Sequence, residues 1–419
     1  MDVKQVFEIT NAMAKEFLGE TAVVAEDLSN VVDIGSKIFE TTDVDNYVKK
    51  LIDKVGRVIF VNRQYTPILP SVEKSGWEFG SILQKVDCDM FEAQENPEWE
   101  LYKYAKGSGD AKAGKPVDQD LFTPPTGVRS KFFNDATTYE VPFSITEEQV
   151  KESFNSAEQL NGFFSMIQTK IKNSLVLRGA GLTRAVINNM IAATVYREFS
   201  DKYSASTKKY TFDETSGVRA VNLLALYRDK GNDPDKKLTP ETCLSSLDFL
   251  KFACYQMKLR LGRVRDISTL FNIGQKERFT PTEMQHFVLL EEFAEAAKIY
   301  LQSDTFHKEL VAMPKYETIN FWQGTGTDYG FSSTSTVHVS SKVFAKDDDI
   351  ATAAPAIVET EVTGVLGVFF DNDALGINNY KSKVTNHYNG HGDFRNYWYK
   401  QFARYFNDYD ENAIVFFVA

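Results

Sequence analysis

Apolar residues recur at steps of three and four through the middle of the chain, which is the spacing of one face of an α-helix. The residues of this face are Val150, Phe154, Ala157, Leu160, Phe164, Ile167, Ile171 and Leu175, followed by Leu182, Val186, Met190 and Ala193. Thr146 and Gln149 have the spacing of a capping box, so the pattern predicts that a helix begins there. We expect a kink or short break at Gly179-Ala180-Gly181. Such a helix would span about 70 Å, which suits a scaffold element better than an ordinary compact domain.

A long irregular connection precedes this helix. Residues 55–65 are rich in β-branched and aromatic residues, which predicts a strand, and we expect its return partner at 132–143. The roughly 65 residues between them hold several prolines, a Gly-rich run at 106–115 and no sustained period. They also hold seven aromatic residues: Trp77, Phe79, Phe91, Trp99, Tyr102, Tyr104 and Phe122. Disordered segments are poor in such residues, so we expect burial on the rest of the molecule or on a neighbouring copy, an additional β-rich domain being the alternative.

Shorter patterns predict the remaining elements. Residues 1–50 hold two short amphipathic stretches, and the polar residues 201–217 indicate a boundary. A Thr before a Pro at the first helical position predicts helices near 240–261 and 281–302. Residues 323–341 are typical of a loop. Strands are predicted at 337–344, 357–370, 396–406 and 413–418.

Composition narrows the class of protein. The chain has 419 residues, of which 43% are hydrophobic and 13% aromatic, so it can bury the core of two or three domains. The net charge of -11 argues against a protein whose main task is to grip phosphate backbones. Three scattered cysteines indicate neither a disulfide framework nor a zinc site, and we interpret Cys254 as a buried free thiol in a reducing, cytosolic setting. We find no secretory signal and no apolar run long enough to span a membrane.

Catalytic and metal-binding patterns are missing or incomplete. The sequence contains no phosphate-binding loop, zinc-protease or nucleophile-elbow motif. The Gly-rich segment 324–328 is interpreted as a loop, 347–349 as a solvated turn, and 371–376 as a turn without the ligands of a calcium loop. His387 and His391 lie in a Gly- and Asn-rich segment, where helical metal-ligand spacing does not apply. We therefore expect no enzyme, no cofactor and no metal site.

The order of parts resembles the Hong Kong 97-type (HK97-like) capsid fold, and the sequence resembles the major head proteins of small tailed phages of Gram-positive hosts. The matching segments are 51–59, 75–80, 131–134, 150–154, 405–408 and 412–418. The resemblance implies an α+β fold with an N-terminal arm (1–50) and an extended β-hairpin E-loop with its base (51–143). It further implies a P-domain spine helix (144–205), an α/β A-domain with P-domain crossings (206–365), and terminal strands that return to the P-domain sheet (366–419).

The implied function is that of a major capsid protein. Copies would form hexamers and pentamers of an icosahedral or prolate head around double-stranded DNA, with a separate scaffolding protein, a portal and, in some relatives, a decoration protein as partners. Assembly in the host cytoplasm, no membrane and no sequence-specific DNA contact are implied as well. The seven loop aromatics would be the subunit-interface residues. Alternatives are a tail, portal-associated or surface-layer protein, or an α/β enzyme such as a hydrolase or transferase.

Overall fold

The computed structural model describes most of the chain from residue 127 onward and short pieces before it. The described residues are 11–12, 14–16, 18–19, 37, 69, 72–74, 83–88, 90, 127–146, 157–212, 214–304, 316–323, 329–348, 350, 352–392 and 394–419, with no side chains described at 145–146, 157–164 and 300–304. The chain divides into two compact units. The first comprises Met1–Tyr65, Val141–Leu175 and Val384–Tyr399, and the second Thr66–Glu140, Val176–Lys383 and Lys400–Ala419.

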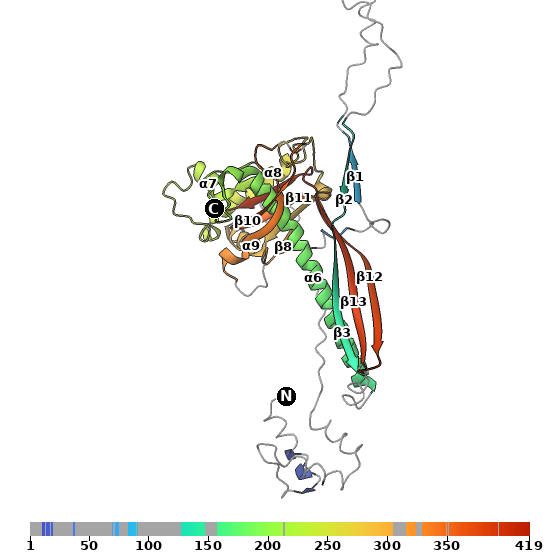
Figure 1. The fold of residues 1–419 in the computed structure, drawn as a ribbon. Helices are drawn as coiled ribbons and strands as arrows, with labels where there is room; N and C mark the ends of the chain where they lie inside the picture. The colour runs from blue at the N-terminus through green and yellow to red at the C-terminus, as the bar shows by residue number, and fades with distance from the viewer. Residues whose placement is uncertain are drawn as a thin grey trace, which may run out of the picture. The chain divides into compact units, whose positions relative to one another are not determined.

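One long helix, α6, runs from Ala157 to Phe199 over 43 residues (Figure 1). The predicted spine helix is thus confirmed, although residues 147–156 after the capping box lie outside the described part. Of the expected kink or short break at Gly179-Ala180-Gly181, the break is wrong, because the helix continues through these residues, while the kink stays a prediction. A Cβ at either glycine would meet no atom within 4 Å, so neither position is needed for close packing. The helix carries both glycines at a cost of about 1 kcal/mol each relative to alanine.

A five-stranded sheet forms the core of the second unit. Its strand order is β6-β14-β11-β7-β8. The strands are β6 (Ala220–Asn222), β14 (Ala413–Phe417), β11 (Val365–Asp371), β7 (Gln285–Leu290) and β8 (Glu317–Ile319). Strand β11 is antiparallel to β14 and β7, while β14 pairs parallel with β6 and β7 pairs parallel with β8. All seven residues of β11 and all five of β14 are buried, as expected for a sheet covered on both faces.

The two faces of this sheet belong to different apolar clusters. Phe370 and Phe417 pack with Val186, Met190 and other residues of α6 on one face. Their chain neighbours, such as Phe369 and Phe416, point the opposite way because side chains alternate along a strand. They pack against the helices of the other face: α7 (Leu223–Asp229), α8 (Leu247–Arg263) and α9 (Glu291–Asp304).

Three smaller sheets complete the described part. One has the order β4-β5-β10-β9, from strands Tyr203–Ser204, Lys209–Tyr210, Ala356–Val362 and Val337–Val343. A second has the order β12-β13-β3, from Leu375–Asn389, Phe394–Asn407 and Ala136–Thr146, three long strands drawn side by side in Figure 1. The third pairs β1 (Leu83–Asp87) with β2 (Arg129–Phe133). Short helices are η2 (Ser200–Lys202), η3 (Cys243–Ser245), η4 (Thr282–Met284) and α10 (Phe331–Thr334).

Several sequence predictions need correction. Residues 285–290, predicted as the start of a helix after Pro281, form strand β7, and the helix begins at Glu291. Strand β12 was missed, because its polar outer half lacks an apolar alternation. Residues 357–370 form two strands, since Gly364 takes a positive φ of 76° between them. The strand expected at 55–65 lies outside the described residues; the described partner of β2 is β1, and that of β3 is β13.

Candidate functional site

The seven aromatic residues predicted to form the subunit interface all lie outside the described part of the chain. What the structure describes is a pair of strands, the stem, between which five of the seven lie in the sequence, while Trp77 and Phe79 precede it. Strands β1 and β2 pair antiparallel from Leu83 opposite Phe133 to Asp87 opposite Arg129. Residues 88–128 connect them, so the stem sets the direction in which that loop leaves the second unit.

The two faces of the stem differ in exposure. Gln84, Val86, Ser130 and Phe132 are exposed on one face, with Val86 at 65% and Phe132 at 63%. The alternate residues are half-buried on the other face, where the Phe133 ring lies 5.4 Å from the Phe406 ring. Lys85 lies directly opposite Lys131 in this register. Like charges in such a pair are destabilising unless counter-charges are close.

The counter-charges come from the turn between β13 and β14. The carboxylate of Asp408, whose side chain is only 3% exposed, accepts from Lys85 Nζ at 2.6 Å and from Lys131 Nζ at 3.0 Å. Lys131 also pairs with Asp410, and Lys85 with Glu411 at 3.0 Å. One buried carboxylate therefore joins both strands of the stem.

Arg278 adds a third cation to this group. Its guanidinium lies 2.5 Å from Asp87 at the end of β1 and 3.4 Å from Glu411. We call Lys85, Asp87, Lys131, Arg278, Asp408, Asp410 and Glu411 the stem clamp. The clamp ties β1 and β2 to two segments distant in sequence, and it is the densest ion-pair network in the described part of the chain.

The electrostatics of the clamp favour the charged forms of its central groups. Burial alone would raise the pKa of the Asp408 carboxyl, but the charges of Lys85 and Lys131 outweigh it and hold this pKa below its ordinary value. Burial likewise opposes the charge of Lys85, yet Asp408 and Glu411 raise the pKa of its amine above the ordinary value. Glu411 differs, because burial raises the pKa of its carboxyl.

The chain before the stem is fixed next to the clamp. The Lys74 backbone N–H donates to the Ile377 carbonyl at 2.8 Å, and Lys74 Nζ donates to Asn372 Oδ1 at 2.5 Å. His286 Nε2 lies 3.0 Å from the same Asn372 oxygen. Burial lowers the pKa of the Lys74 amine. The chain before β1 is thereby tied to the turn after β11 and to the start of β12.

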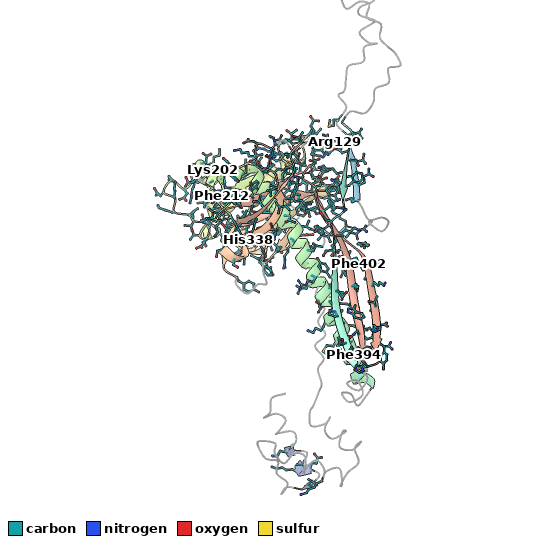
Figure 2. The ribbon with its side chains drawn as sticks, in the orientation of Figure 1. Arg129, Lys202, Phe212, His338, Phe394 and Phe402 are labelled. Carbon is teal, nitrogen blue, oxygen red and sulfur yellow. The ribbon has the colours of Figure 1, made fainter. Side chains whose placement is uncertain are left out.

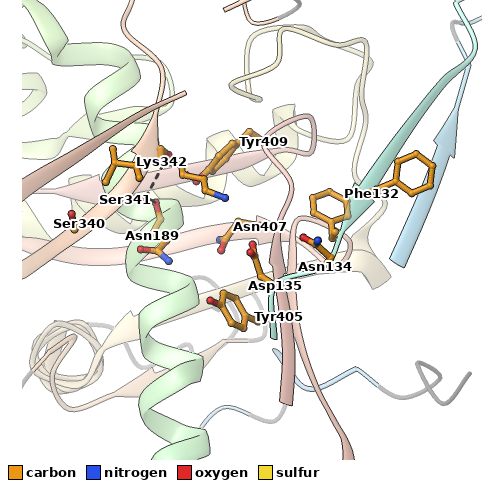
Figure 3. Close-up of a pocket in the computed structure, with 12 residues that line it drawn as sticks. Phe132, Asn134, Asp135, Asn189, Ser340, Ser341, Lys342, Tyr405, Asn407 and Tyr409 are labelled. Carbon is orange, nitrogen blue, oxygen red and sulfur yellow. Dashed lines mark hydrogen bonds between the residues drawn. The ribbon is translucent and has the colours of Figure 1, made fainter. Parts of the chain in front are cut away.

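A pocket of about 440 Å³ lies beside the clamp (Figure 3). Its lining comes from the β2–β3 corner, α6, β9, β10, β13 and the following turn. The lining residues are Phe132, Phe133, Asn134, Asp135, Asn189, Ser340, Ser341, Lys342, Ile357, Tyr405, Asn407 and Tyr409. The lining is mainly polar and aromatic, with one acidic residue, Asp135, and one basic residue, Lys342.

The other sequence candidates have structural roles. Asp371, in the segment compared with a calcium loop, accepts from the Thr280 hydroxyl at 2.6 Å and from the Asp373 N–H at 2.9 Å, as in a turn. His387 lies in β12 and His391 in the next turn, and the described residues contain no metal-ligand cluster of three or more. Asp348 Oδ2 closes a turn by accepting from Ala345 N–H, whereas residues 324–328 lie outside the described part.

The cysteines are as expected. Cys254 is buried, and burial raises the pKa of its thiol to about 12, which confirms an inert free thiol. Burial likewise raises the pKa of Cys243 to about 12, while Cys88 is exposed. Among the described helices, none is long and apolar enough to cross a membrane.

The clamp residues were not identified from the sequence. Lys131 and Asp408 lie within the segments that carry the family resemblance, but nothing in the sequence pairs them. They are 277 residues apart, and only the strand register brings Lys85 and Lys131 to one carboxylate. Lys85, Lys131 and Asp408 all lie outside the strands predicted from the sequence, so no strand pattern indicated them.

Comparisons with known proteins agree with this architecture. A family model described as "Phi29-like phage major capsid protein" matches residues 10–417. Among solved structures, a chain of the "Capsid structure of Staphylococcus phage Andhra" is 10% identical with a TM-score of 0.52, covering 87% of each chain. A chain from "Structure of head fiber and inner core protein gp22 of native bacteriophage P68" is 8% identical with the same TM-score, covering 87% of this chain and 88% of that one. No curated protein matches this sequence.

Proposed function

Because this chain belongs to the Phi29-like phage major capsid protein family, and so is a structural, capsid-forming protein with an α+β, HK97-like fold, we propose how its parts build the shell. Its copies assemble into hexamers and pentamers that close into an icosahedral or prolate head around double-stranded DNA. Contacts that repeat head to tail form a closed ring when the rotation between successive copies brings the last copy back to the first. The observation that supports this proposal is the stem clamp, because it fixes the base of a long aromatic loop on the subunit.

We propose that the loop between the stem strands reaches a neighbouring copy. Five of the predicted interface aromatics, Phe91, Trp99, Tyr102, Tyr104 and Phe122, would bury their rings there, and Trp77 and Phe79, just before β1, would join them, since aromatic side chains dominate the cores of obligate interfaces. The described stem supports this, because its outer face already exposes Val86 and Phe132. The proposed parts keep the boundaries given above: arm 1–50, loop and base 51–143, spine helix 144–205, A-domain 206–365 and terminal strands 366–419.

The proposal includes partners and a setting. A separate scaffolding protein, a portal and a decoration protein are the helpers, and assembly takes place in the host cytoplasm before the protein becomes part of the virion. The proposed role is structural and not catalytic. The shell would hold DNA without reading its sequence.

Negative-stain imaging after sizing chromatography tests the proposed function. The protein is expressed alone and with its candidate scaffolding protein. We expect closed polyhedral particles, or hexamers and pentamers, in at least one of the two preparations. A monomer or dimer in both would contradict the proposal, and open tubes would favour a tail protein.

Substitution of the loop tryptophans tests the interface residues. Trp77→Ala and Trp99→Ala are each expected to lower particle yield at least about tenfold, because loss of a buried interface tryptophan costs roughly 2 kcal/mol or more at each contact. The midpoint of urea unfolding of the unassembled subunit should not change. A two-residue Gly-Ser insertion after Gly109, within the Gly-rich run, is the control and should assemble normally. Loss of subunit stability with normal assembly would contradict an interface role.

A further inference from the structure

Lys74 and Asn372 bring an amine and a carboxamide into contact over a large separation in sequence. Lys74 Nζ donates to Asn372 Oδ1 at 2.5 Å, and 298 positions separate the two residues. Because an amide C=O bond is about 1.2 Å long, Nζ lies at most about 3.7 Å from the Asn372 carbonyl carbon, Cγ. Reacting atoms in near-attack geometry are about 3–3.5 Å apart. The amine is therefore close to the distance at which it can attack this carbon.

The structure holds the Lys74 side chain in position along its length. Its backbone N–H donates to the Ile377 carbonyl at 2.8 Å. Its aliphatic part packs on Gly376, where an added Cβ would lie 2.7 Å from Lys74 Cγ and force a shift. Burial lowers the pKa of the amine, although the charges of Asp373 and Asp371 oppose this, and a lower pKa favours the neutral, nucleophilic form. Lys74 therefore loses little conformational freedom when its amine approaches the amide.

The Asn372 amide has the partners that an attack on its carbon needs. His286 Nε2 lies 3.0 Å from the same Oδ1, and because an amide oxygen only accepts hydrogen bonds, this nitrogen carries a proton and donates it. Asn372 Nδ2 donates to Asp373 Oδ1 at 3.0 Å, so a carboxylate lies next to the nitrogen that would leave. The Asn372 backbone N–H donates to the Met284 carbonyl at 2.9 Å, which holds the residue in place. A nucleophile, an oxygen-binding donor and a proton carrier thus surround one carboxamide.

A lysine that served only as a hydrogen-bond donor would gain more from a carboxylate than from a neutral amide. Asp371 and Asp373 flank Asn372 in the sequence, yet within the described residues Lys74 forms an ion pair with neither. Asp371 instead accepts from the Thr280 hydroxyl at 2.6 Å, and Asp373 accepts from Asn372 Nδ2. The arrangement therefore places the amine on the amide and a carboxylate on the leaving nitrogen.

We propose that Lys74 and Asn372 form an intramolecular isopeptide bond, in which Nζ replaces Nδ2 on Cγ and ammonia is released. Asp373, whose charge acts on the Lys74 amine, accepts one proton from the ammonium, and the neutral amine attacks Cγ. The oxyanion that forms on Oδ1 accepts from His286 Nε2–H. Asp373 then donates its proton to Nδ2, the Cγ–Nδ2 bond breaks, and the ammonia that leaves takes up the second lysine proton. The reaction needs no oxidant, reductant or cofactor, and it occurs once in each chain.

The bond would give the base of the stem a connection that does not depend on charge. The closed segment from 74 to 372 contains both stem strands, β1 and β2. The ion pairs of the stem clamp weaken as salt is added, because salt screens charges, whereas an amide bond does not. The inference is independent of how copies assemble, because both reacting residues belong to one subunit.

Mass spectrometry of the full-length subunit, denatured after incubation at mildly alkaline pH, tests the bond. We expect the intact mass to be lower than that of the sequence by one ammonia molecule, and a protease digest to contain a branched peptide that joins Lys74 to Asn372. Lys74→Arg keeps the positive charge but offers no amine, so it should have the full mass. Lys202→Arg, at a lysine labelled in Figure 2, is the matched control and should keep the lower mass.

Substitutions beside the amide test the assigned roles. Linking is followed by pulse-chase and denaturing gel electrophoresis, because a chain closed between 74 and 372 is more compact when denatured and migrates faster than a linear chain. Asp373→Asn should slow linking about a hundredfold, because it removes the proton carrier. His286→Phe should slow it at least about tenfold, whereas His338→Phe, at a histidine labelled in Figure 2, should link at the wild-type rate. Wild-type rates in both Asp373→Asn and His286→Phe would overturn the proposed mechanism.

A second route to the same mass must be separated from the isopeptide bond. Asn372 can lose ammonia without Lys74, by ring closure on the backbone nitrogen of Asp373 to give a succinimide. The lower mass would then persist in Lys74→Arg and disappear in Asn372→Ala, and that result would overturn the inference. A wild-type subunit with full mass and no branched peptide would overturn it as well. Neither result depends on particle formation, so both are distinct from a failure of the proposed shell function.

Discussion

Replacing Asp408 by asparagine is expected to lower the free energy of unfolding of the unassembled subunit by about 3 kcal/mol. The substitution removes the carboxylate between Lys85 and Lys131 and leaves two ammonium groups opposed on neighbouring strands. Removing one partner of a buried ion pair costs about 3–5 kcal/mol, and the partial exposure of the two lysines, 25% and 40%, places this case at the lower end. Urea unfolding measures the change, and hydrogen exchange of 83–87 and 129–133 should rise.

Two controls test whether the loss of stability in Asp408→Asn arises from the stem clamp. Asp201→Asn removes an exposed carboxylate 3.9 Å from Lys346 and should change the free energy of unfolding by less than about 0.5 kcal/mol. Adding Lys131→Met to Asp408→Asn should restore part of the loss, because it removes the like-charge pair. A double variant that is less stable than Asp408→Asn alone would contradict the clamp as described.

The same substitution predicts a dependence on pH. In the folded subunit the pKa of Asp408 lies below its ordinary value, so this carboxyl binds fewer protons in the folded than in the unfolded chain. Its contribution to the free energy of unfolding is therefore complete above the ordinary aspartate pKa of about 4. This contribution is lost as the pH falls through the lowered pKa. Glu411 acts in the opposite sense, because its pKa is raised. The difference in stability between wild type and Asp408→Asn should therefore shrink below about pH 4, and a constant difference would exclude this origin.

Replacing Trp322 by alanine is expected to cost about 4 kcal/mol of subunit stability, the largest effect of a single substitution that we predict. Its side chain is fully buried in the cluster between α6 and the five-stranded sheet, and Nε1–H donates to the Val365 carbonyl at 2.8 Å. Truncating a buried tryptophan costs about 3–5 kcal/mol, and the substitution also leaves that carbonyl without its donor. Urea unfolding of the unassembled subunit measures the loss.

Trp322→Phe separates packing from hydrogen bonding. Phenylalanine keeps most of the apolar volume and removes the Nε1–H donor, so we expect a loss of about 2 kcal/mol. Tyr329→Ala, at a side chain that is 68% exposed, is the surface control and should change stability little. Equal losses for Trp322→Phe and Trp322→Ala would show that the hydrogen bond, and not the packed volume, dominates.

Elements with a strong local period were predictable from the sequence. The apolar stripe of α6 and the continuous apolar runs of β11 and β14 indicate helix and strand with little ambiguity, because each is buried along its whole inner face. The prediction failed at β7, where the Thr-Pro helix-start signal was given more weight than the apolar run that follows it. In β7 the run His286 to Leu290 lacks a period of two, and the preceding Pro281 suggested a helix.

The candidate site was harder to predict for a different reason. A strand register decides that Lys85 faces Lys131, and a turn more than 270 residues further along the chain supplies Asp408. No local sequence pattern indicates that Lys85 and Lys131 contact Asp408. The aromatic loop could be identified by composition, whereas the ionic network that holds its stem depends on tertiary structure.

The position of β14 has a consequence for biosynthesis. Residues 413–417 insert between β6 and β11, so the sheet lacks an inner strand until they have been made. Strand β6 is translated about 190 residues earlier, a delay of roughly 10–40 s at ribosomal rates of about 5–20 residues per second. During this time β6 lacks its β14 partner, and β11, once made, lacks a partner on the edge opposite β7, so both resemble the exposed edges that promote aggregation. A chain that is still being translated therefore cannot complete its own sheet. A subunit can take part in shell building only after residues 413–417 have left the ribosome.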